Sequence, residues 1–362
     1  FWGIPDSQFL DGRVSLESNP LPGITTLLGQ SLAASPPNQP APLRLTAMPT
    51  RQLHITAGNA PEVPVISALR AVLTRSPAVI KSPAECTLSG ALLALAVAAA
   101  QPDHPLTRHL SIVYWPGGDE SIEGALFAPG AFDRVIVWGA PQAVASVQAR
   151  ALYTRVIPLN PRYGVSLVGR EAFSNDLQQV ATLGAQDSLI YNQKACNASL
   201  IHYVEGSPEQ ALSYAEFLQR ALHEWDELAP PFIPPGVRGQ LKRMQRGKYA
   251  RATWLLNLHE AEYTSGVLLT SEAFDVLDHP MARLVVVRPV DDLQETLRYL
   301  HAGVSTVGVY PQARRLDLEN RIAARGVSSV LPLGSCDTHF PGPPQDGMRV
   351  LAEMVDWKLS AE

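Results

Sequence analysis

From Gln52 onward, short apolar segments alternate with longer segments of helical periodicity, and this alternation limits the fold more than any other feature. Apolar strands are predicted at residues 53–56, 77–81, 109–115, 131–138 and 155–159. Helices are predicted between them at residues 62–75, 84–101 and 142–152. Such alternation is typical of an α/β fold, a mainly parallel sheet with helices on both faces. Because these sheets bind ligands at the carboxyl ends of their strands, the informative loops are 58–61, 81–85 and 138–141.

The predicted parts of the chain are an N-terminal arm, two α/β units and a final helix, at residues 1–50, 51–186, 187–345 and 346–362. The arm holds seven prolines between Pro20 and Pro49, which suits an extended segment better than a packed unit. A basic stretch at residues 238–251 follows a proline-rich break in the second unit. Asp346 is the predicted N-cap of the final helix.

Composition and charge exclude several classes of protein. With 46% hydrophobic and 17% charged residues, the chain of 362 residues is an ordinary folded protein. Its net charge of -5 argues against nucleic acid as the main partner. The longest apolar stretch, residues 91–100, is too short for a membrane span. The three cysteines lie far apart without metal-ligand spacing, which predicts no metal, no disulfide framework and a reducing, cytoplasmic location.

Cys196 is the strongest candidate for a catalytic residue. It lies where a polar, helix-like turn passes into an apolar, strand-like segment that begins near Leu200. A cysteine at such a junction is held on rigid backbone and can face a cleft, where its thiolate attacks carbonyl carbons. The alternative is a structural thiol, because cysteine is among the most buried residue types. His202, in the following segment, is predicted to be a core or edge residue rather than a base.

Asn59 is a candidate for a hydrogen-bond donor at the reacting carbonyl. It precedes a predicted helix whose first turn contains Pro61, and helix N-termini present unpaired N–H groups and partial positive charge. An Asn amide at that place can donate to a developing oxyanion. The residue type alone favours a simpler interpretation, in which Asn59 only caps the helix.

Two further loops suit a nucleotide cofactor. Lys81 ends an apolar strand and, with Ser82, opens a helix, a setting suited to a ribose or phosphate contact. The alternative for Lys81 is a surface lysine. Trp138 and Gly139 end another strand, where the glycine lets backbone approach a cofactor, although the sequence contains no G-x-G-x-x-G.

Taken in order along the chain, these loops resemble those of LuxC-type acyl-CoA reductases. These are the fatty-acid reductase components of bacterial luminescence systems and their relatives, a branch of the aldehyde dehydrogenase superfamily. The resemblance runs from about Gln52 to Trp357. It rests on Gly58-Asn59-Ala60-Pro61, Lys81-Ser82-Pro83, Trp138-Gly139, Tyr163-Gly164 with Ser166, Gln193-Lys194-Ala195-Cys196, Thr306-Val307-Gly308 and Asp346-Gly347.

The resemblance implies an aldehyde-dehydrogenase-like α/β fold, in which a Rossmann-like cofactor domain at 51–186 accompanies an α/β catalytic domain at 187–345. It implies that Cys196 is acylated by an acyl-CoA thioester, that Asn59 belongs to the oxyanion hole, and that NADPH reduces the acyl group to an aldehyde. It matches Lys81 to the lysine that contacts the adenosine ribose and Gly139 to the glycine beside the cofactor. Their neighbours Ser82 and Trp138 are the other two expected cofactor contacts. It further implies a homo-oligomer that works with an acyl-transferring or aldehyde-consuming enzyme.

Two departures from the superfamily pattern refine this expectation. Oxidising members carry a Glu-Leu-Gly-Gly segment whose Glu activates water; here the stretch is residues 163–170, which suits a reductase, although Glu171 lies close by. Many NAD-dependent members carry Glu three residues after the lysine, where this chain has Ala84, and this favours NADPH. A shift of one residue would place Glu85 there and reverse the preference.

Alternatives to an acyl-CoA reductase remain open at this point. An acyl-carrier-protein thioester or an acyl phosphate would barely change the chemistry at the site. A non-catalytic scaffold subunit of an acyl-processing complex would keep the fold without the reaction. The joint presence of Asn59, Lys81 and Cys196 argues against the scaffold.

Overall fold

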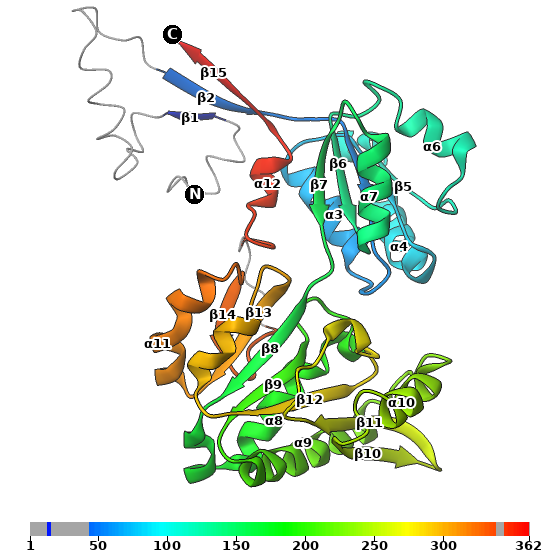
Figure 1. Ribbon diagram of the computed structural model, residues 1–362. Coiled ribbons are helices and arrows are strands. Elements are labelled where there is room, and N and C mark those ends of the chain that lie inside the picture. The colour runs from blue at the N-terminus through cyan, green and yellow to red at the C-terminus, as the bar shows by residue number, and fades with distance from the viewer. Residues whose placement is uncertain (1–12, 16–42, 338–343, 362) are drawn as a thin grey trace, which may run out of the picture. The chain divides into compact units, whose positions relative to one another are not determined.

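The computed structural model describes residues 13–15, 43–337 and 344–361, and the chain divides into two compact units (Figure 1). The first unit combines residues 1–160 with residues 348–362, and the second is residues 161–347. Apart from 13–15 and 43–50, the predicted N-terminal arm lies outside the described residues. Each unit is built on its own main sheet.

The first unit contains a five-stranded parallel sheet of order β5-β4-β3-β6-β7. Its strands are β3 (Gln52–Ile55), β4 (Ala78–Lys81), β5 (Leu110–Val113), β6 (Arg134–Trp138) and β7 (Arg155–Leu159). Its helices are α3 (Val63–Leu73), η1 (Ala84–Cys86), α4 (Thr87–Ala100), α5 (Pro105–His109), α6 (Glu120–Leu126) and α7 (Pro141–Arg150). All strands and helices predicted for this part of the chain are confirmed, with small shifts at their ends.

Strand β6 shows why the strands of this sheet are continuous apolar stretches in the sequence. Val135 and Val137 pack in one cluster with Val144 of α7, whereas Ile136 packs in another with Val350 near the C-terminus. A parallel strand covered on both faces needs apolar side chains at every position, so its pattern does not alternate.

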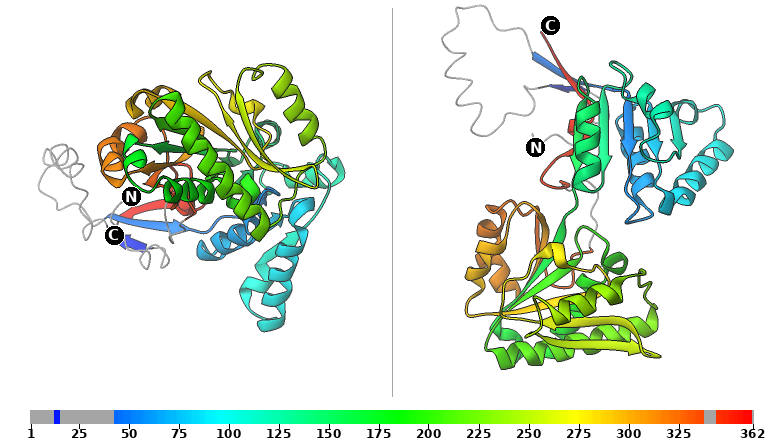
Figure 2. Two further views of the ribbon diagram at one scale, coloured as in Figure 1. Left: turned by 90° about the horizontal axis from the view of Figure 1, so that it is seen from below. Right: turned by 45° about the vertical axis from the view of Figure 1, so that its right-hand side comes forward.

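A second, antiparallel sheet in the first unit joins the two ends of the chain. It contains β1 (Arg13–Ser15), β2 (Leu43–Met48) and β15 (Asp356–Ala361), with β2 in the middle. Figure 2 shows β2 and β15 running side by side in both views. The predicted C-terminal helix is wrong: α12 covers only Val350–Glu353, and its N-cap is Arg349 rather than Asp346. The tail alternates apolar and polar residues from Trp357 to Ser360, a strand pattern that pairs with β2.

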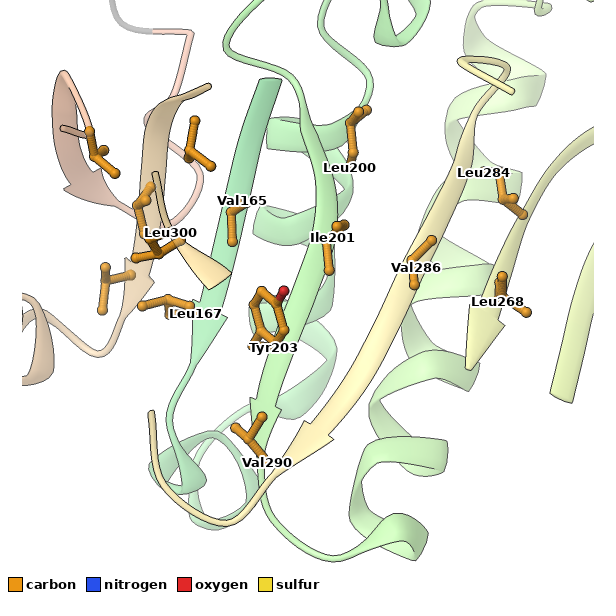
Figure 3. Close-up of a cluster of buried hydrophobic side chains, with 14 of the residues drawn as sticks. Val165, Leu167, Leu200, Ile201, Tyr203, Leu268, Leu284, Val286, Val290 and Leu300 are labelled. Carbon is orange, nitrogen blue, oxygen red and sulfur yellow. The ribbon is translucent and has the colours of Figure 1, made fainter. Parts of the chain in front are cut away.

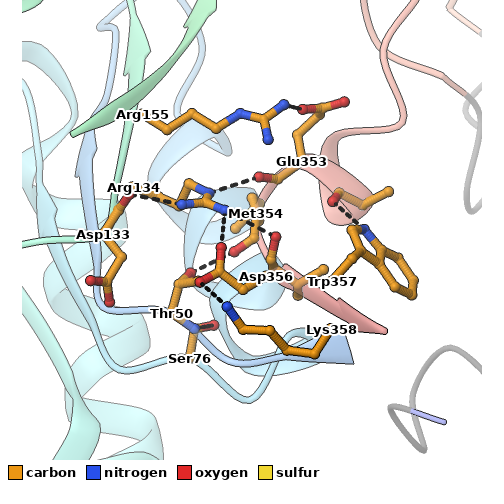
Figure 4. Close-up of polar contacts among 12 residues, drawn as sticks. Thr50, Ser76, Asp133, Arg134, Arg155, Glu353, Met354, Asp356, Trp357 and Lys358 are labelled. Carbon is orange, nitrogen blue, oxygen red and sulfur yellow. Dashed lines mark hydrogen bonds and ion pairs between the residues drawn. The ribbon is translucent and has the colours of Figure 1, made fainter. Parts of the chain in front are cut away.

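Arg134 fixes the return of the chain into the first unit. Its side chain is only 10% exposed and donates to the carbonyl oxygens of Glu353 and Val355, each at 3.1 Å (Figure 4). It also pairs with Asp356 at the start of β15. On the same segment, the carbonyl of Met354 accepts hydrogen bonds from the side chains of Thr50 and Gln52.

The second unit contains a seven-stranded sheet of order β10-β11-β12-β9-β8-β13-β14, parallel except for the β10–β11 hairpin. Its strands are β8 (Tyr163–Val168), β9 (Ser199–Glu205), β10 (Thr253–His259), β11 (Glu262–Leu269), β12 (Leu284–Val290), β13 (Val304–Tyr310) and β14 (Ser329–Pro332). Its helices are η2 (Arg170–Ser174), α8 (Leu177–Ser188), η3 (Ile190–Gln193), α9 (Pro208–Leu228), α10 (Val237–Arg246), η4 (Val276–Asp278), η5 (Leu293–Tyr299) and α11 (Gln312–Ala323).

Two apolar clusters cover the two faces of this sheet. One packs α8 and α9 against it, and the other packs α10, η5 and α11. Figure 3 shows the second cluster, in which Leu167, Tyr203 and Val286 project from neighbouring strands. The predicted boundary at residue 187 falls inside this unit, because β8 pairs with both β9 and β13 near the middle of the sheet.

Among the described residues, no helix has the length and apolar character needed to cross a lipid bilayer.

Candidate active site

The carboxyl edge of the first sheet brings together the loops that the sequence singled out in this unit. The chain passes from β3 through α3 to β4 on one side, and from β6 through α7 to β7 on the other. The order of strands therefore reverses between β3 and β6, which are paired. Open parallel sheets bind their ligands at such a reversal, beyond the carboxyl ends of the strands. Asn59, Lys81 and Gly139 all follow or end strands at this edge.

Asn59 is not the N-cap residue of α3. The helix begins at Val63 with Glu62 as its N-cap, and no side-chain capping hydrogen bond forms there. Asn59 lies three residues earlier, exposed in the loop after β3. The N-cap position of α3 therefore belongs to Glu62, and the role of Asn59 as a donor to a ligand stays a prediction.

Lys81 is half-buried at the end of β4, among aromatic and acidic groups. Its Nζ lies 5.4 Å from the ring centroid of Trp115. Burial lowers the pKa of Lys81, while the nearby carboxylates of Glu123 and Glu85 act to raise it. Glu85 also packs against the loop that holds Asn59, because a Cβ placed on Gly58 would lie 2.6 Å from Glu85 Oε2. The edge therefore offers one cation and one carboxylate to a ligand.

Ser82 is placed differently from the expectation. Its side chain is 2% exposed, and a Cβ on Gly90 of α4 would lie 2.7 Å from its Oγ. The hydroxyl is turned beneath α4, away from the sheet edge, and forms no hydrogen bond to any described residue. The burial of this hydroxyl argues against a cofactor contact through the Ser82 side chain.

Trp138 and Gly139 end β6 at the same edge. Gly139 has φ of +154°, a backbone conformation that residues other than glycine rarely adopt. The Trp138 ring is packed among apolar residues, with the Arg70 guanidinium 5.3 Å from its centroid. Gly139 lies two residues before α7, whose N-cap Ala140 makes no side-chain capping hydrogen bond. Its backbone is thus the part of this pair that suits a cofactor.

Cys196 belongs to the second unit, in the turn between η3 and β9. The residue is exposed, unlike Cys86 and Cys336, and none of these three described thiols forms a disulfide. Ser305 Oγ donates to the carbonyl oxygen of Cys196, and Asn197 Nδ2 donates to the carbonyl oxygen of Cys336 at 2.7 Å. An accessible thiol on a turn anchored at both sides is suited to nucleophilic attack.

The turn before Cys196 has an unusual backbone. Tyr191, Asn192 and Gln193 all have positive φ, between 49° and 68°. Three such residues in a row are costly unless their surroundings hold them, and strain of this kind clusters at functional sites. Gln193 Nε2 donates to the carbonyl oxygen of Leu284 at 2.7 Å, which ties the turn to β12.

A buried polar network holds the side chain of Asn192. Arg283 Nε donates to Asn192 Oδ1 at 2.6 Å, and Arg283 Nη1 pairs with Asp226 Oδ1 at 2.8 Å. The side chains of Arg283 and Asp226 are 8% and 5% exposed. Ser265 Oγ donates to the other oxygen of Asp226 at 2.6 Å. Sequence reasoning missed this network, since its members come from distant segments and match no motif.

Glu171 lies at the wrong end of the sheet to act near Cys196. Cys196 precedes the amino end of β9, whereas Glu171 follows the carboxyl end of the parallel neighbour β8. A strand of this length separates them by about 20 Å. Glu171 accepts a hydrogen bond from Arg314 Nε at 2.8 Å instead. Tyr163 lies at the amino end of β8, the same end of the sheet as Cys196. Burial raises the pKa of Tyr163 to about 12.

Two other titratable groups of the second unit are structural. His202 is fully buried between Ser188 Oγ and Tyr214 OH, both at 2.9 Å, and burial lowers its pKa to about 3. The expectation that His202 is a core residue is confirmed. Cys336 is buried beside Asp187, and burial raises its thiol pKa far above the usual range. Among the described residues, no cluster of three or more His, Cys, Asp or Glu could hold a metal ion.

The fold of the chain is that of the aldehyde dehydrogenases. Aldehyde dehydrogenase 21 from Physcomitrella patens superimposes with a TM-score of 0.72 at 13% identity, over 91% of this chain and 73% of that one. The NADP-dependent glyceraldehyde-3-phosphate dehydrogenase from Bacillus halodurans gives 0.71 at 15% identity, over 90% and 72%. The predicted aldehyde-dehydrogenase-like α/β fold is confirmed.

Within that fold, the chain belongs to one family: a model described as acyl-CoA reductase (LuxC) matches residues 38–357. A long-chain acyl-protein thioester reductase from Photorhabdus laumondii is 27% identical over 85% of this chain. One from Vibrio harveyi is 26% identical over 84%. The chain spans 63% of the length of each of these relatives. The predicted resemblance to the LuxC family is thereby confirmed.

Proposed function

We propose that this protein reduces a long-chain acyl thioester to the aldehyde through an acyl group carried on Cys196. The observation that carries the proposal is the exposure of Cys196 on a strained, anchored turn of a chain that belongs to the acyl-CoA reductase family. The other two thiols are buried. Cys196 is therefore the thiol that a substrate can reach.

The first step is transthioesterification. The Cys196 thiolate attacks the carbonyl carbon, its sulfur forms a new bond to the acyl group, and the bond to the substrate's own sulfur breaks. The leaving thiolate takes up the proton that Cys196 gave up, so the step is balanced. Negative charge develops on the carbonyl oxygen, and we assign the Asn59 amide to donate to it; such a donor typically contributes about 3 kcal/mol.

The residues at the carboxyl edge of the first sheet fit a nicotinamide dinucleotide. Lys81 would contact the adenosine ribose or its phosphate, and the backbone at Gly139 would lie beside the dinucleotide. When bound, the cofactor supplies the hydride that reduces the Cys196 thioester, and collapse of the resulting hemithioacetal releases aldehyde and the thiol. We propose NADPH, because Ala84 leaves room for a 2′-phosphate beside Lys81.

The place of Glu171 supports reduction over oxidation. A carboxylate that activates water would hydrolyse the acyl group before reduction. Glu171 is at the far end of β8 and engaged by Arg314, whereas Tyr163 lies at the near end, where its hydroxyl is 3.3 Å from His301 Nε2. With its pKa raised to about 12, Tyr163 stays protonated at neutral pH and cannot activate water.

Two different descriptions bear on the identity of the substrate carrier. The family is described as acyl-CoA reductase, while the matched relatives are named long-chain acyl-protein thioester reductases. We propose an acyl-CoA thioester as the substrate for assay, in a homo-oligomeric cytoplasmic enzyme that works with an acyl-transferring or aldehyde-consuming partner. A reductase of carrier-protein thioesters or acyl phosphates is the alternative, and relative rates with these substrates decide between them.

The experiment is intact-protein mass spectrometry after exposure to long-chain acyl-CoA. We expect one acyl adduct, which disappears when NADPH is added as aldehyde forms. Cys196→Ala should form no adduct and no aldehyde, whereas Cys86→Ala, a matched change at a buried thiol, should keep both. An unmodified wild-type protein would instead support a scaffold subunit without catalysis.

A further inference from the structure

Helix α10 and the turn after it concentrate positive charge. Between residues 238 and 251 the chain has six cationic side chains and no acidic one, although its net charge is -5. All six are exposed, and we call them the basic face: Arg238, Lys242, Arg243, Arg246, Lys248 and Arg251. The proposed reaction makes no use of this face.

Most of this charge is not neutralised within the unit. Arg238 pairs with Glu262, and Lys248 pairs with Asp278 at 3.0 Å. Among the described residues, no carboxylate forms an ion pair with the remaining four members of the basic face, Lys242, Arg243, Arg246 and Arg251. Such a face attracts an acidic partner.

The opposite side of α10 excludes a membrane as the preferred partner. Val237, Leu241 and Met244 are buried in the core of the second unit. An amphipathic helix that lies in a lipid surface inserts its apolar side, and here that side is already packed. The basic face is therefore suited to a soluble acidic surface.

Exposed apolar side chains border the basic face and connect it to the Cys196 turn. Phe232, which is 66% exposed, accepts a hydrogen bond on its carbonyl oxygen from Asn192 Nδ2 at 2.9 Å. Lys194, two residues before Cys196, has its Nζ 5.8 Å from the Phe232 ring centroid. Leu277, which is 87% exposed, lies on η4. Gln240 of α10 donates a hydrogen bond to the carbonyl oxygen of Asp278, also on η4. Aromatic, aliphatic and Arg side chains together are typical of protein interfaces.

We propose that the basic face, with Phe232 and Leu277 at its border, docks an acidic protein that carries an acyl thioester and delivers it to Cys196. The inference rests on the proposed function, because it requires Cys196 as the acyl acceptor. The acyl group leaves the carrier's sulfur and bonds to the sulfur of Cys196, so the transfer needs no further reactant.

The test compares one acyl group on two carriers, an acyl carrier protein and CoA. The variant is Lys242→Glu with Arg246→Glu, and the control, Arg321→Glu with Arg325→Glu, places the same charge change on exposed residues at α11. We expect the KM for the acyl protein to rise about tenfold in the variant, with its kcat at saturation and the acyl-CoA kinetics unchanged. The control should match the wild type, and added salt should raise only the KM for the acyl protein.

Other outcomes overturn the proposal. An equal rise in KM for acyl-CoA would assign the basic face to the CoA phosphates, and unchanged kinetics with both substrates would leave it a solvated surface. Lost binding to phosphatidylglycerol vesicles, without a kinetic change, would assign it to a membrane. A wild type that reduces acyl-CoA but not the acyl protein would refute docking alone, while one that reduces neither would refute the proposed function as well.

Discussion

Arg283 links the strained turn before Cys196 to a buried carboxylate. Its replacement should lower both the stability of the fold and the rate of Cys196 acylation. Arg283→Met leaves Asp226 buried without its partner, which should cost about 3–5 kcal/mol in the free energy of unfolding. It also removes the donor to Asn192 Oδ1, so the turn that presents Cys196 should lose its position. Chemical denaturation and the rate of Cys196 acylation measure the two effects.

A second variant distinguishes positioning from folding. Arg283→Met combined with Asp226→Asn removes the unpaired charge while keeping an acceptor for Ser265. Stability should recover in part, but acylation should stay slow because Asn192 still lacks its donor. Acylation that recovers together with stability would show that the network only supports the fold.

Lys81 and Glu85 determine the charge that a nucleotide meets at the first sheet's edge. Lys81→Ala should raise the KM for NADPH about tenfold and the KM for NADH less, because a 2′-phosphate depends more on a cation. Glu85→Gln should lower the KM for NADPH by removing a nearby negative charge. If Glu85→Gln instead weakens NADH binding and leaves NADPH unchanged, Glu85 is a ribose ligand and the preference is for NADH.

At the scale of single residues, the sequence identified those candidates that lie in local motifs. Asn59, Lys81, Gly139 and Cys196 each stand at a junction between a strand and a turn or helix, which periodicity can detect. The burial of the Ser82 hydroxyl against Gly90 of α4 argues against its predicted role, because the direction of a side chain matters as well as its position. Partners from distant segments, such as Ser305 on the carbonyl of Cys196, carry no local signal at all.

At the scale of elements, the β2–β15 pairing depends on one buried side chain. Arg134→Met removes both donors to the backbone of 353–355 and should cost about 3 kcal/mol. Hydrogen exchange should quicken in β15 and β2 and stay unchanged in the second unit's sheet. The control is Arg155→Met, which breaks an exposed pair with Glu353 and should cost less than about 1 kcal/mol. Equal losses in the two variants would contradict this role for Arg134.

The regular part of the fold was predictable, and the irregular parts were not. Strands β3 to β7 are buried on both faces, so their apolar runs are plain in the sequence. The helix α10 was missed, because the many charges between residues 238 and 251 hid the helical spacing of Val237, Leu241 and Met244. The strand β10 was also missed. The final helix was predicted from a plausible cap at Asp346, but a cap cannot reveal that β2 pairs with the tail.

At the scale of the whole molecule, three buried neutral histidines predict acid sensitivity. Burial lowers the pKa of His54 and His202 to about 3 and that of His279 to about 4, from 6.5. Below pH 6.5 the unfolded chain binds protons that the folded chain does not, so stability is complete above that pH. It should fall by up to about 1.4 kcal/mol per pH unit for each histidine between pH 6.5 and 4.

Urea denaturation at pH 7.5 and pH 5 measures whether the free energy of unfolding falls with pH, and variants show whether the histidines cause the fall. His279→Asn should flatten the pH dependence, because its amide oxygen can replace Nδ1 as the acceptor for the Met281 N–H without titrating. His223→Asn changes an exposed histidine on α9 and should leave the dependence unchanged. A stability that rises as the pH falls would contradict the assignment.

The first unit is built from two separate segments of the chain, and residues 161–347, the second unit, lie between them in the sequence. During synthesis the inserted unit can complete its sheet from contiguous sequence as it leaves the ribosome, while the earlier-made unit waits for its closing strand. A product truncated before Asp356 would leave the ribosome with an intact second unit and an unpaired edge on β2. Such an edge can pair with other chains, so proteostasis in the cell should remove products that lack residues 356–361.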